Sequence, residues 1–335
     1  MQKNVTAPFV HTEKTVHDRA IEWFVALSPI LVWSVFMFGA RVLSLCLISS
    51  CFAVGLDYLV RRYVFKMQKG TRVDLMTAVY GILSAFMMPV AVSFFVPILA
   101  SVFVVLAKNI KPFRAKHLFN PFVFSAAMLN LLCKTQMTAF TRPFAYFSAF
   151  SFSIDEKLVS GYRVISPLQY MADGSVYEDG VLAQLYGYAS GCIGEIAVAA
   201  ILVALIWLCI RKEADWRGTV AFLVPILLLA LMYPSDDAES NYYAYSVLLS
   251  GSIVFLAAFG TNESLSVPMT KTGRYVFGFV CGVLTFILRK TSGGFEWGYI
   301  VVLVMNIVTP FIEEFTKPKV LNEKKGNNEK RRNND

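Results

Sequence analysis

The chain has 335 residues, of which 56% are hydrophobic and only 16% are charged, and its formal net charge is +8. A soluble globular protein carries roughly 45–50% apolar and about 25% charged residues, so this composition excludes an ordinary soluble domain. It favours a membrane protein with many spans. A helix that crosses the hydrocarbon needs about 20 mostly apolar residues, so ten spans fit within this length.

Apolar runs separated by charged or turn residues predict an all-α polytopic membrane protein with about ten transmembrane helices in two groups of five. A polar stretch at 134–189 lies between the groups and is too rich in charge and turn residues to cross a membrane. The expected spans lie near 21–39, 42–60, 75–92, 94–107 and 119–133, and then near 190–210, 218–233, 243–260, 275–288 and 297–315.

The positive charges are distributed unevenly between the two predicted faces. If the N-terminus is cytoplasmic, the segments on the inside hold most of the 31 lysines and arginines, and only a few, Arg41 among them, fall outside. The positive-inside rule therefore predicts a multi-pass protein of the cytoplasmic (inner) membrane with both termini in the cytoplasm. This asymmetry and the basic tail account for the net charge, so no nucleic-acid partner is expected.

Because five is an odd number, the second group of spans must begin on the opposite face and lie inverted relative to the first. We therefore expect a first five-helix repeat at 1–133, an extracytoplasmic segment at 134–189, a second repeat at 190–316 and a disordered basic tail at 317–335. Such a plan places a site near the midplane, where broken helices of both halves meet. The candidate breaks are Phe119–Pro121, Gly191–Gly194 and Ser266–Pro268.

Several segments, in order, carry a resemblance to a known family. The clearest runs from Gly273 to Glu314, where a glycine-rich span is followed by Arg289, Gly293, Glu296 and then an Asn-x-x-x-Pro-x-x-acid pattern. Two further blocks are Leu118-Phe119-Asn120-Pro121 and Gly191-Cys192-Ile193-Gly194-Glu195. In their joint order and spacing they resemble the RnfD/NqrB family over nearly the whole chain.

The resemblance implies a membrane subunit of an Rnf- or Nqr-type complex, which relays electrons while Na⁺ or H⁺ crosses the membrane. It would act as part of an oxidoreductase translocase with the other subunits, and no catalytic residue is expected in the chain alone. The implied cofactor is FMN, with riboflavin as a further candidate, and a flavin transferase would be a partner. Asn120, Pro121 and Arg289 are the implied cofactor-binding positions besides the attachment residue.

The family esterifies FMN to a threonine in a Ser-Gly-Ala-Thr-Pro-Leu context, and here Ser166, followed by Pro167 and Leu168, takes the threonine's place. A serine hydroxyl can form the same phosphoester, although Val164 and Ile165 replace the small residues before it. The alternative is a serine–proline turn on an outer loop.

Two other departures from the family pattern indicate a divergent member with altered cofactor content. Basic and bulky residues at 111–117 replace a glycine-rich stretch, and Asn262 follows Thr261 where an acid is usual, with Glu263 one position later. Two rival functions therefore stay open. One is a solute transporter or channel of the same fold, and the other is a scaffold subunit without flavin.

Acidic residues in or beside spans are the candidates for an ion path, because a charge at mid-bilayer costs about 2.5–3.5 kcal/mol on insertion scales. Glu195 is expected in the first turn or two of the sixth span, either as an ion, proton or flavin contact or as an interfacial helix acid. Glu296, Glu313 and Asp74 lie at span ends and are further candidates. Asp57, one turn before Arg61, is expected to form a snorkelling ion pair. No cysteine or histidine spacing indicates a metal site.

Overall fold

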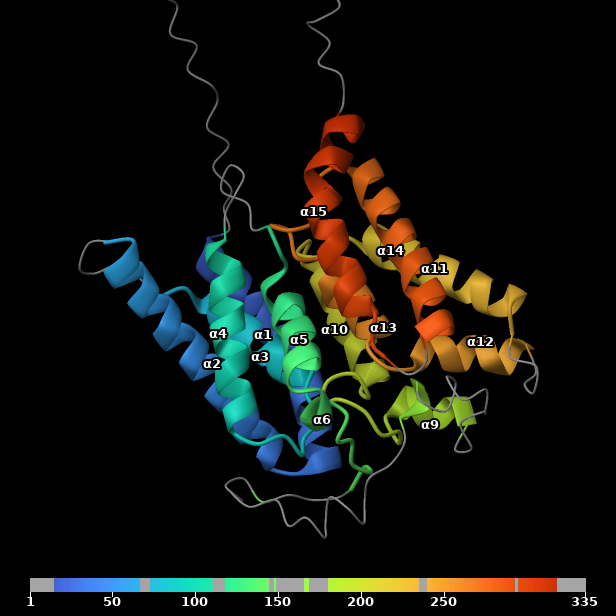
Figure 1. Cartoon of the computed structure of the whole chain (residues 1–335), viewed down its shortest axis with the longest axis horizontal. Helices are drawn as coiled ribbons and strands as arrows, with labels where there is room; N and C mark the ends of the chain where they lie inside the picture. Colours follow the sequence, from blue (N-terminus) through green and yellow to red (C-terminus); the bar gives the residue numbers. More distant parts are fainter. Residues whose placement is uncertain are drawn as a thin grey trace, which may run out of the picture.

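The computed structural model describes residues 15–66, 73–110, 118–144, 148, 166–168, 180–234, 240–292 and 295–317. These residues form helices and irregular segments and contain no strand (Figure 1). The first half comprises α1 (Val16–Phe38), α2 (Arg41–Leu59) with the π-helical turn η1 (Val60–Val64), α3 (Leu75–Phe86), α4 (Phe95–Asn109), α5 (Pro121–Leu132) and α6 (Lys134–Met137). The second comprises α9 (Gly180–Tyr186), α10 (Val198–Ile210), α11 (Trp216–Met232), α12 (Ser240–Leu249), α13 (Ile253–Phe255), η2 (Leu256–Gly260), α14 (Lys271–Ser292) and α15 (Gly298–Thr316).

The ten expected spans correspond to ten helical units of the described chain, but these units differ in length. Four helices, α1, α2 with η1, α14 and α15, are long and apolar enough to cross a membrane by themselves. The α12 helix and the α13–η2 unit pass the same test together, bent by 61° at their break. The apolar helices α3, α4, α5, α10 and α11 are shorter. A 12-residue helix rises about 18 Å, which is less than the roughly 30 Å of hydrocarbon.

The structure corrects three of the expected spans. The third helix ends at Phe86, whereas the apolar run predicts helix to 92, and the sixth begins at Val198 rather than near 190. The eighth span is interrupted at residues 250–252. Hydropathy does not reveal the break after Phe86 because residues 87–94 are themselves mostly apolar, and the three residues 250–252 are too few to interrupt the apolar run around them.

The two halves pack in the same way. The second helix of each half contacts the third and the fourth: α2 contacts α3 and α4, and α11 contacts α12 and α14. The fourth helix of each half contacts the fifth: α4 contacts α5, and α14 contacts α15. The halves join through α1 with α10 and through α5 with α15, which are equivalent helices. Figure 1 shows α5 descending from Pro121 while α15 ascends to Thr316. This is the arrangement of an inverted repeat.

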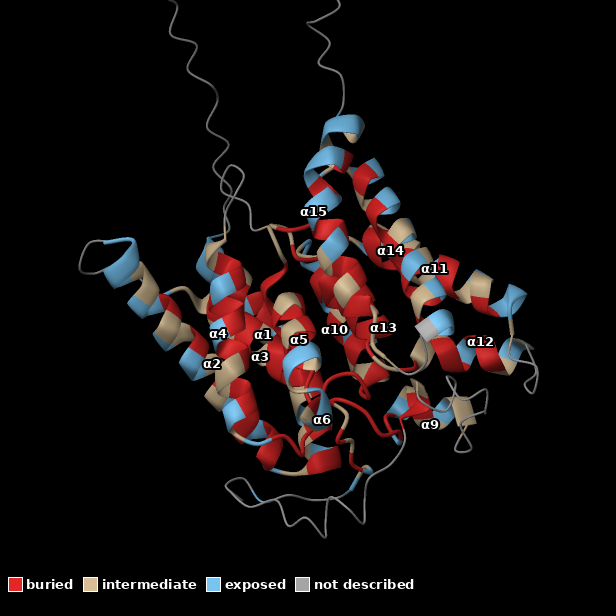
Figure 2. Cartoon of the chain, in the orientation of Figure 1, coloured by how far each residue is buried: buried red, intermediate tan, exposed pale blue. Residues whose placement is uncertain are grey.

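Burial follows the junction between the halves. In Figure 2 the buried residues gather where α1, α3, α5, α10 and α13 meet, and the outward faces of the helices are exposed. Large apolar side chains are common on those outer faces, including Leu47, Ile206 and Phe279. Contiguous apolar surface of this kind is typical of a face that contacts lipid. The core therefore lies between the two repeats.

Candidate functional site

Two irregular segments, 87–94 after α3 and 187–197 before α10, lie side by side at the junction of the halves. The amide of Ile193 donates to the carbonyl of Met88 at 2.9 Å, and the amide of Gly194 donates to that of Phe86 at 2.7 Å. A Cβ on Gly194 would stand 2.5 Å from the Cβ of Phe86, so only glycine allows this approach. The expected break at Gly191–Gly194 is present, and its backbone is satisfied by the first half.

Arg41 holds the other irregular segment in place. Its side chain is 1% exposed, its Nε donates to the carbonyl of Val90 at 2.9 Å, and its Nη2 donates to that of Val92 at 2.8 Å. The guanidinium also lies 4.6 Å from the ring centroid of Phe94. Unwound carbonyls inside a membrane protein need such partners. The sequence places Arg41 among the outside charges, because its position between two spans resembles that of a loop.

Glu195 lies in the turns that precede α10, not in the first turn of a helix as expected, since the helix begins at Val198. Its side chain is buried, and its Oε1 accepts a short hydrogen bond from the hydroxyl of Tyr299 on α15. An interfacial helix acid would be exposed to headgroups and water. The burial of Glu195 therefore does not fit the interfacial alternative.

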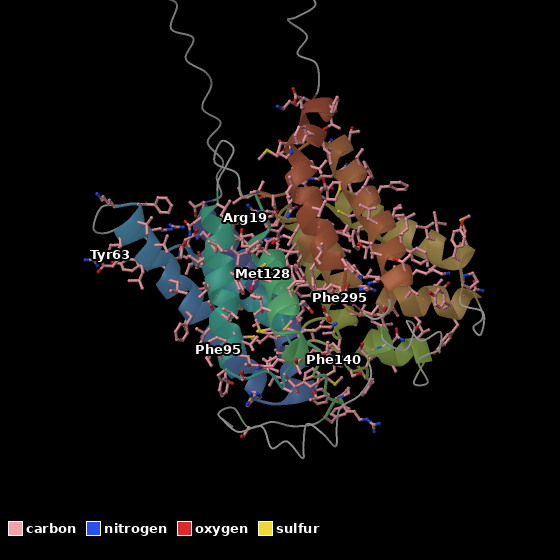
Figure 3. The ribbon with its side chains drawn as sticks, in the orientation of Figure 1. Arg19, Tyr63, Phe95, Met128, Phe140 and Phe295 are labelled. Atoms are coloured by element: carbon pink, nitrogen blue, oxygen red, sulfur yellow. The ribbon has the colours of Figure 1, made fainter. Side chains whose placement is uncertain are left out.

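Arg289 and Glu296 form an ion pair beside the break between α12 and α13. The Nη2 of Arg289 lies 2.5 Å from both carboxylate oxygens of Glu296, and its Nη1 donates to the carbonyl of Ser250 at 3.2 Å. The amide of Ser252 donates to Glu296 at 3.2 Å. Gly251, at φ +57°, lies against both side chains, where a Cβ would meet the carboxylate. Phe295, labelled in Figure 3, marks this place near the start of α15.

Together these residues form a cluster in which negative charge exceeds positive charge, and we call it the acidic cluster: Glu195, Tyr299, Glu296 and Arg289. The two carboxylates interact electrostatically with each other, and the one guanidinium interacts with both. When both carboxyl groups are ionised, the formal charges of Glu195, Glu296 and Arg289 sum to −1. Burial makes such a charge costly, so a bound proton or small cation would relieve it.

A second buried glutamate has the same kind of partner. Glu263, in the irregular segment after η2, is 1% exposed and accepts from the hydroxyl of Tyr80 at 2.9 Å and from that of Ser266 at 2.7 Å. In the sequence this acid is notable only as a shifted family position. Its signal was an acidic residue following a long apolar run, which would have marked it as a candidate.

Asn120 joins the fifth helices of the two halves. It is fully buried, its backbone amide donates to the side-chain oxygen of Asn306 at 3.0 Å, and its Nδ2 reaches the carbonyl of Gly260 at 3.4 Å. The bond to Asn306 holds for the amide orientation that satisfies both ends of that side chain. The Oδ1 of Asn120 has no hydrogen-bond partner. Pro121 then starts α5, a position where its missing N–H costs nothing.

The remaining acidic candidates lie apart from the acidic cluster. Asp74 is the N-cap of α3 and pairs with Lys108 and Arg61, each at 2.8 Å. The half-buried Glu313, near the end of α15, accepts from the amide of Met269 at 2.9 Å. Among the described residues, no group of three histidine, cysteine, aspartate or glutamate side chains is placed to hold a metal ion.

Ser166 is the residue on which the flavin expectation rests. It is 6% exposed and precedes the short turn at Pro167 and Leu168, while Val164, Ile165 and the stretch 111–117 lie outside the described residues. A hydroxyl has the right chemistry for a phosphoester, and the unpartnered Oδ1 of Asn120 offers an acceptor to a bound group. Taken singly, each of these two side chains has a polar atom that could contact a flavin.

The fold and site define a multi-pass, all-α membrane protein with broken helices and buried ionisable groups. The sequence profile of the NQR2, RnfD, RnfE family matches residues 3–322, and the chain belongs to this family. The resemblance noted from its motifs is thus confirmed.

Similar proteins cover nearly the whole chain. One, in Acetobacterium woodii, belongs to the Na⁺-translocating ferredoxin:NAD⁺ oxidoreductase complex and is 25% identical over 319 residues, covering 94% of this chain and 93% of that protein. Another, in the proton-translocating ferredoxin:NAD⁺ oxidoreductase complex of Clostridium ljungdahlii, is 24% identical, covering 95% and 96%. A third, from the Na⁺-translocating NADH-quinone reductase of Chromohalobacter salexigens, is 27% identical, covering 86% and 68%. Each of the three is one subunit of its complex.

Proposed function

We propose that this protein is a membrane subunit of an ion-translocating oxidoreductase complex of the Rnf or Nqr type, relaying electrons while Na⁺ or H⁺ crosses the membrane. The family membership and the relatives that carry such names support this proposal. The observation that carries it is the acidic cluster, where residues of the family motifs meet at a broken helix. The other subunits of the complex would be its partners.

The acidic cluster is the proposed place where the ion is held. Arg289 forms its ion pair with Glu296, so an ionised Glu195 would leave one negative charge for a bound proton or cation to balance. The hydroxyl of Tyr299 orients the Glu195 carboxylate, and the backbone amide of Ser252 fixes Glu296. Relatives whose names specify Na⁺ and H⁺ are about equally similar to this chain, so the proposal covers both ions.

The redox chemistry is proposed to come from FMN held at Ser166, which would supply the electron transfer. Riboflavin is the further candidate cofactor. In this proposal the protein supplies position and dry surroundings. Asn120 and Arg289 are the polar side chains at helix breaks that remain candidates for contact with a flavin.

We also propose that the protein lies in the inner membrane with both termini in the cytoplasm. The start of α1 and the end of α15 lie on the same side of the molecule in Figure 1, as an even number of crossings requires. The asymmetry of lysine and arginine along the chain supports the cytoplasmic assignment of that side.

A second candidate, a scaffold subunit without covalent flavin, is favoured by one observation. Ser166 is buried, and a transferase needs its target hydroxyl exposed. Such a subunit would keep the fold and its place in the complex.

The presence or absence of a covalently attached flavin distinguishes the two candidate functions. The full chain would be expressed with its complex and a flavin transferase, denatured, and examined for flavin fluorescence in the gel and for modified peptides by mass spectrometry. We expect an FMN mass on the peptide that contains Ser166, lost in Ser166→Ala and kept in Ser148→Ala. Ser148 is a matched control because it is exposed in the same extramembrane segment. A non-fluorescent, unmodified wild-type chain would establish the scaffold instead.

A further inference from the structure

A cavity of about 630 Å³ lies at the opposite end of the bundle from the acidic cluster. It is bounded where α1, α11 and α14 begin and where α10 ends (Figure 1), and Arg19, labelled in Figure 3, lines it. Cavities that hold small molecules measure about 300–1,000 Å³, so its size is sufficient for a ligand. The proposed electron and ion transfer uses none of the residues that line this cavity.

Cations outnumber acids in the lining. The positive side chains are those of Arg19, Lys212, Arg217 and Arg274, and the negative ones are those of Glu213 and Asp215. Two positive charges therefore stay uncompensated in a partly enclosed space. Arg217 and Arg274 lie close together, because both form ion pairs with the carboxylate of Asp215.

The ion pairs of the cavity leave donors unused. Arg19 Nε lies 3.1 Å from a carboxylate oxygen of Glu213, but the alignment makes no hydrogen bond, and this buried N–H has no acceptor. Asp215 divides its carboxylate between Arg217 at 3.1 Å and Arg274 at 3.6 Å. A guanidinium has five N–H donors, so each arginine keeps donors for a further acceptor.

The backbone adds to the positive potential. Helices α1, α11 and α14, of 23, 17 and 22 residues, all begin at the cavity, and a helix N-terminus carries about half a positive charge. The C-terminus of α10 opposes them with one partial negative charge. The dipoles and the side chains therefore both favour an anion.

We propose that this cavity binds a phosphate-bearing anion, with Arg217 and Arg274 as the principal contacts and Lys212 as a further charge. Paired guanidinium groups match the oxygens of a phosphate geometrically and electrostatically. The phosphate belongs either to the headgroup of an anionic phospholipid at the end of the helices or to a soluble phosphate compound. Both sources present the same group to the same side chains.

The test compares both sources on the purified full chain. Inorganic pyrophosphate would be titrated calorimetrically against the protein in detergent, and retention of phosphatidylglycerol over phosphatidylcholine would be measured by native mass spectrometry after release from mixed nanodiscs. The variants are Arg217→Gln and Lys212→Gln. Arg142→Gln is the control, since Arg142 is an exposed cation outside the cavity. Lys212 is exposed at the end of α10, so its substitution leaves the ion pairs of the cavity intact and the fold unchanged.

We expect binding to weaken about tenfold in Arg217→Gln, less in Lys212→Gln, and not at all in Arg142→Gln. Loss of pyrophosphate binding alone would identify a soluble phosphate compound, and loss of phosphatidylglycerol retention alone would identify the lipid. If Arg217→Gln does not fold, Lys212→Gln decides. The proposal is overturned if the wild type binds neither probe or if the cavity variants bind both as the control does.

Discussion

In the described chain a buried ionic cluster lies in each half, and these two clusters differ in charge balance. In the first half, Asp57 and Asp74 face Arg61 and Lys108, and every carboxylate has two cations within 2.9 Å. In the second half, Arg289 pairs with Glu296, and Glu195 adds a second carboxyl group that interacts electrostatically with both. The first cluster is neutral, whereas the second keeps one negative charge.

The difference shows which buried acids can take up a further proton or cation. A cluster whose formal charges cancel needs no ligand for charge balance, and its ion pairs fix α2, α3 and α4 to one another. A cluster with a negative surplus is relieved by each proton or cation that enters it. Asp57 was expected to snorkel with its neighbouring arginine, but it is buried and also pairs with Lys108 on α4, which sequence spacing does not reveal.

The largest expected effect is on stability in the first half. Lys108→Met leaves Asp57 and Asp74 with only Arg61, and breaking a buried ion pair in this way costs about 3–5 kcal/mol. The measurement is the unfolding transition of the purified chain in detergent. Lys134→Met, at an exposed lysine, is the control. Equal stability of the two variants would contradict a structural role for this cluster.

The second effect is on transport. Glu195→Gln removes the surplus charge of the acidic cluster, so ion uptake coupled to electron transfer in proteoliposomes of the whole complex should fall at least about tenfold. Stability should change little, because an amide keeps the shape and can still accept from Tyr299. Glu314→Gln, at an exposed acid on α15, is the control. Normal transport by Glu195→Gln would remove this residue from the ion path.

A smaller effect separates the two buried glutamate–tyrosine pairs. Tyr299→Phe removes one hydrogen bond to Glu195, and Tyr80→Phe removes one to Glu263, which keeps a second hydroxyl from Ser266. We expect the coupled transport rate to fall between about threefold and tenfold in Tyr299→Phe, and less in Tyr80→Phe. If the order is reversed, Glu263 rather than Glu195 is the more sensitive site.

The smallest expected effect is the loss of folding stability at low pH that comes from Asp74, the residue of the first cluster that precedes the third span. Burial tends to raise the pKa of Asp74, but the charges and hydrogen bonds of Lys108 and Arg61 outweigh it and hold that pKa below its ordinary value. Because the folded pKa is depressed, the stabilisation is present above the unfolded pKa of about 3.9 and is lost as the pH falls below it.

Melting temperatures between pH 6 and pH 3 test this prediction. The wild type should lose more stability over this range than Asp74→Asn, whose asparagine keeps the helix cap without a titrating group. Identical pH profiles would show that Asp74 does not carry the acid response.

The sequence determined the class of protein, the approximate spans and the family. The length of the apolar segments can be read without tertiary information, because the membrane imposes it on each segment separately. The distribution of charge and the order of the motifs are likewise read directly from the sequence. The proline at 121 and the glycines at 191 and 194 also marked real breaks, because the restricted backbone of proline and the freedom of glycine act locally.

Only the tertiary structure decided which charges meet. The sequence assigned Arg41 to the outer side of the membrane but did not show its partners. The structure shows that it is buried against the carbonyls of Val90 and Val92. Glu195 lies 104 positions from its partner Tyr299, and Tyr80 lies 183 positions from Glu263. These contacts depend on how distant segments pack, within one half for Arg41 and for Glu195 with Tyr299 and between the halves for Tyr80 with Glu263, and such packing leaves no periodic pattern in the sequence.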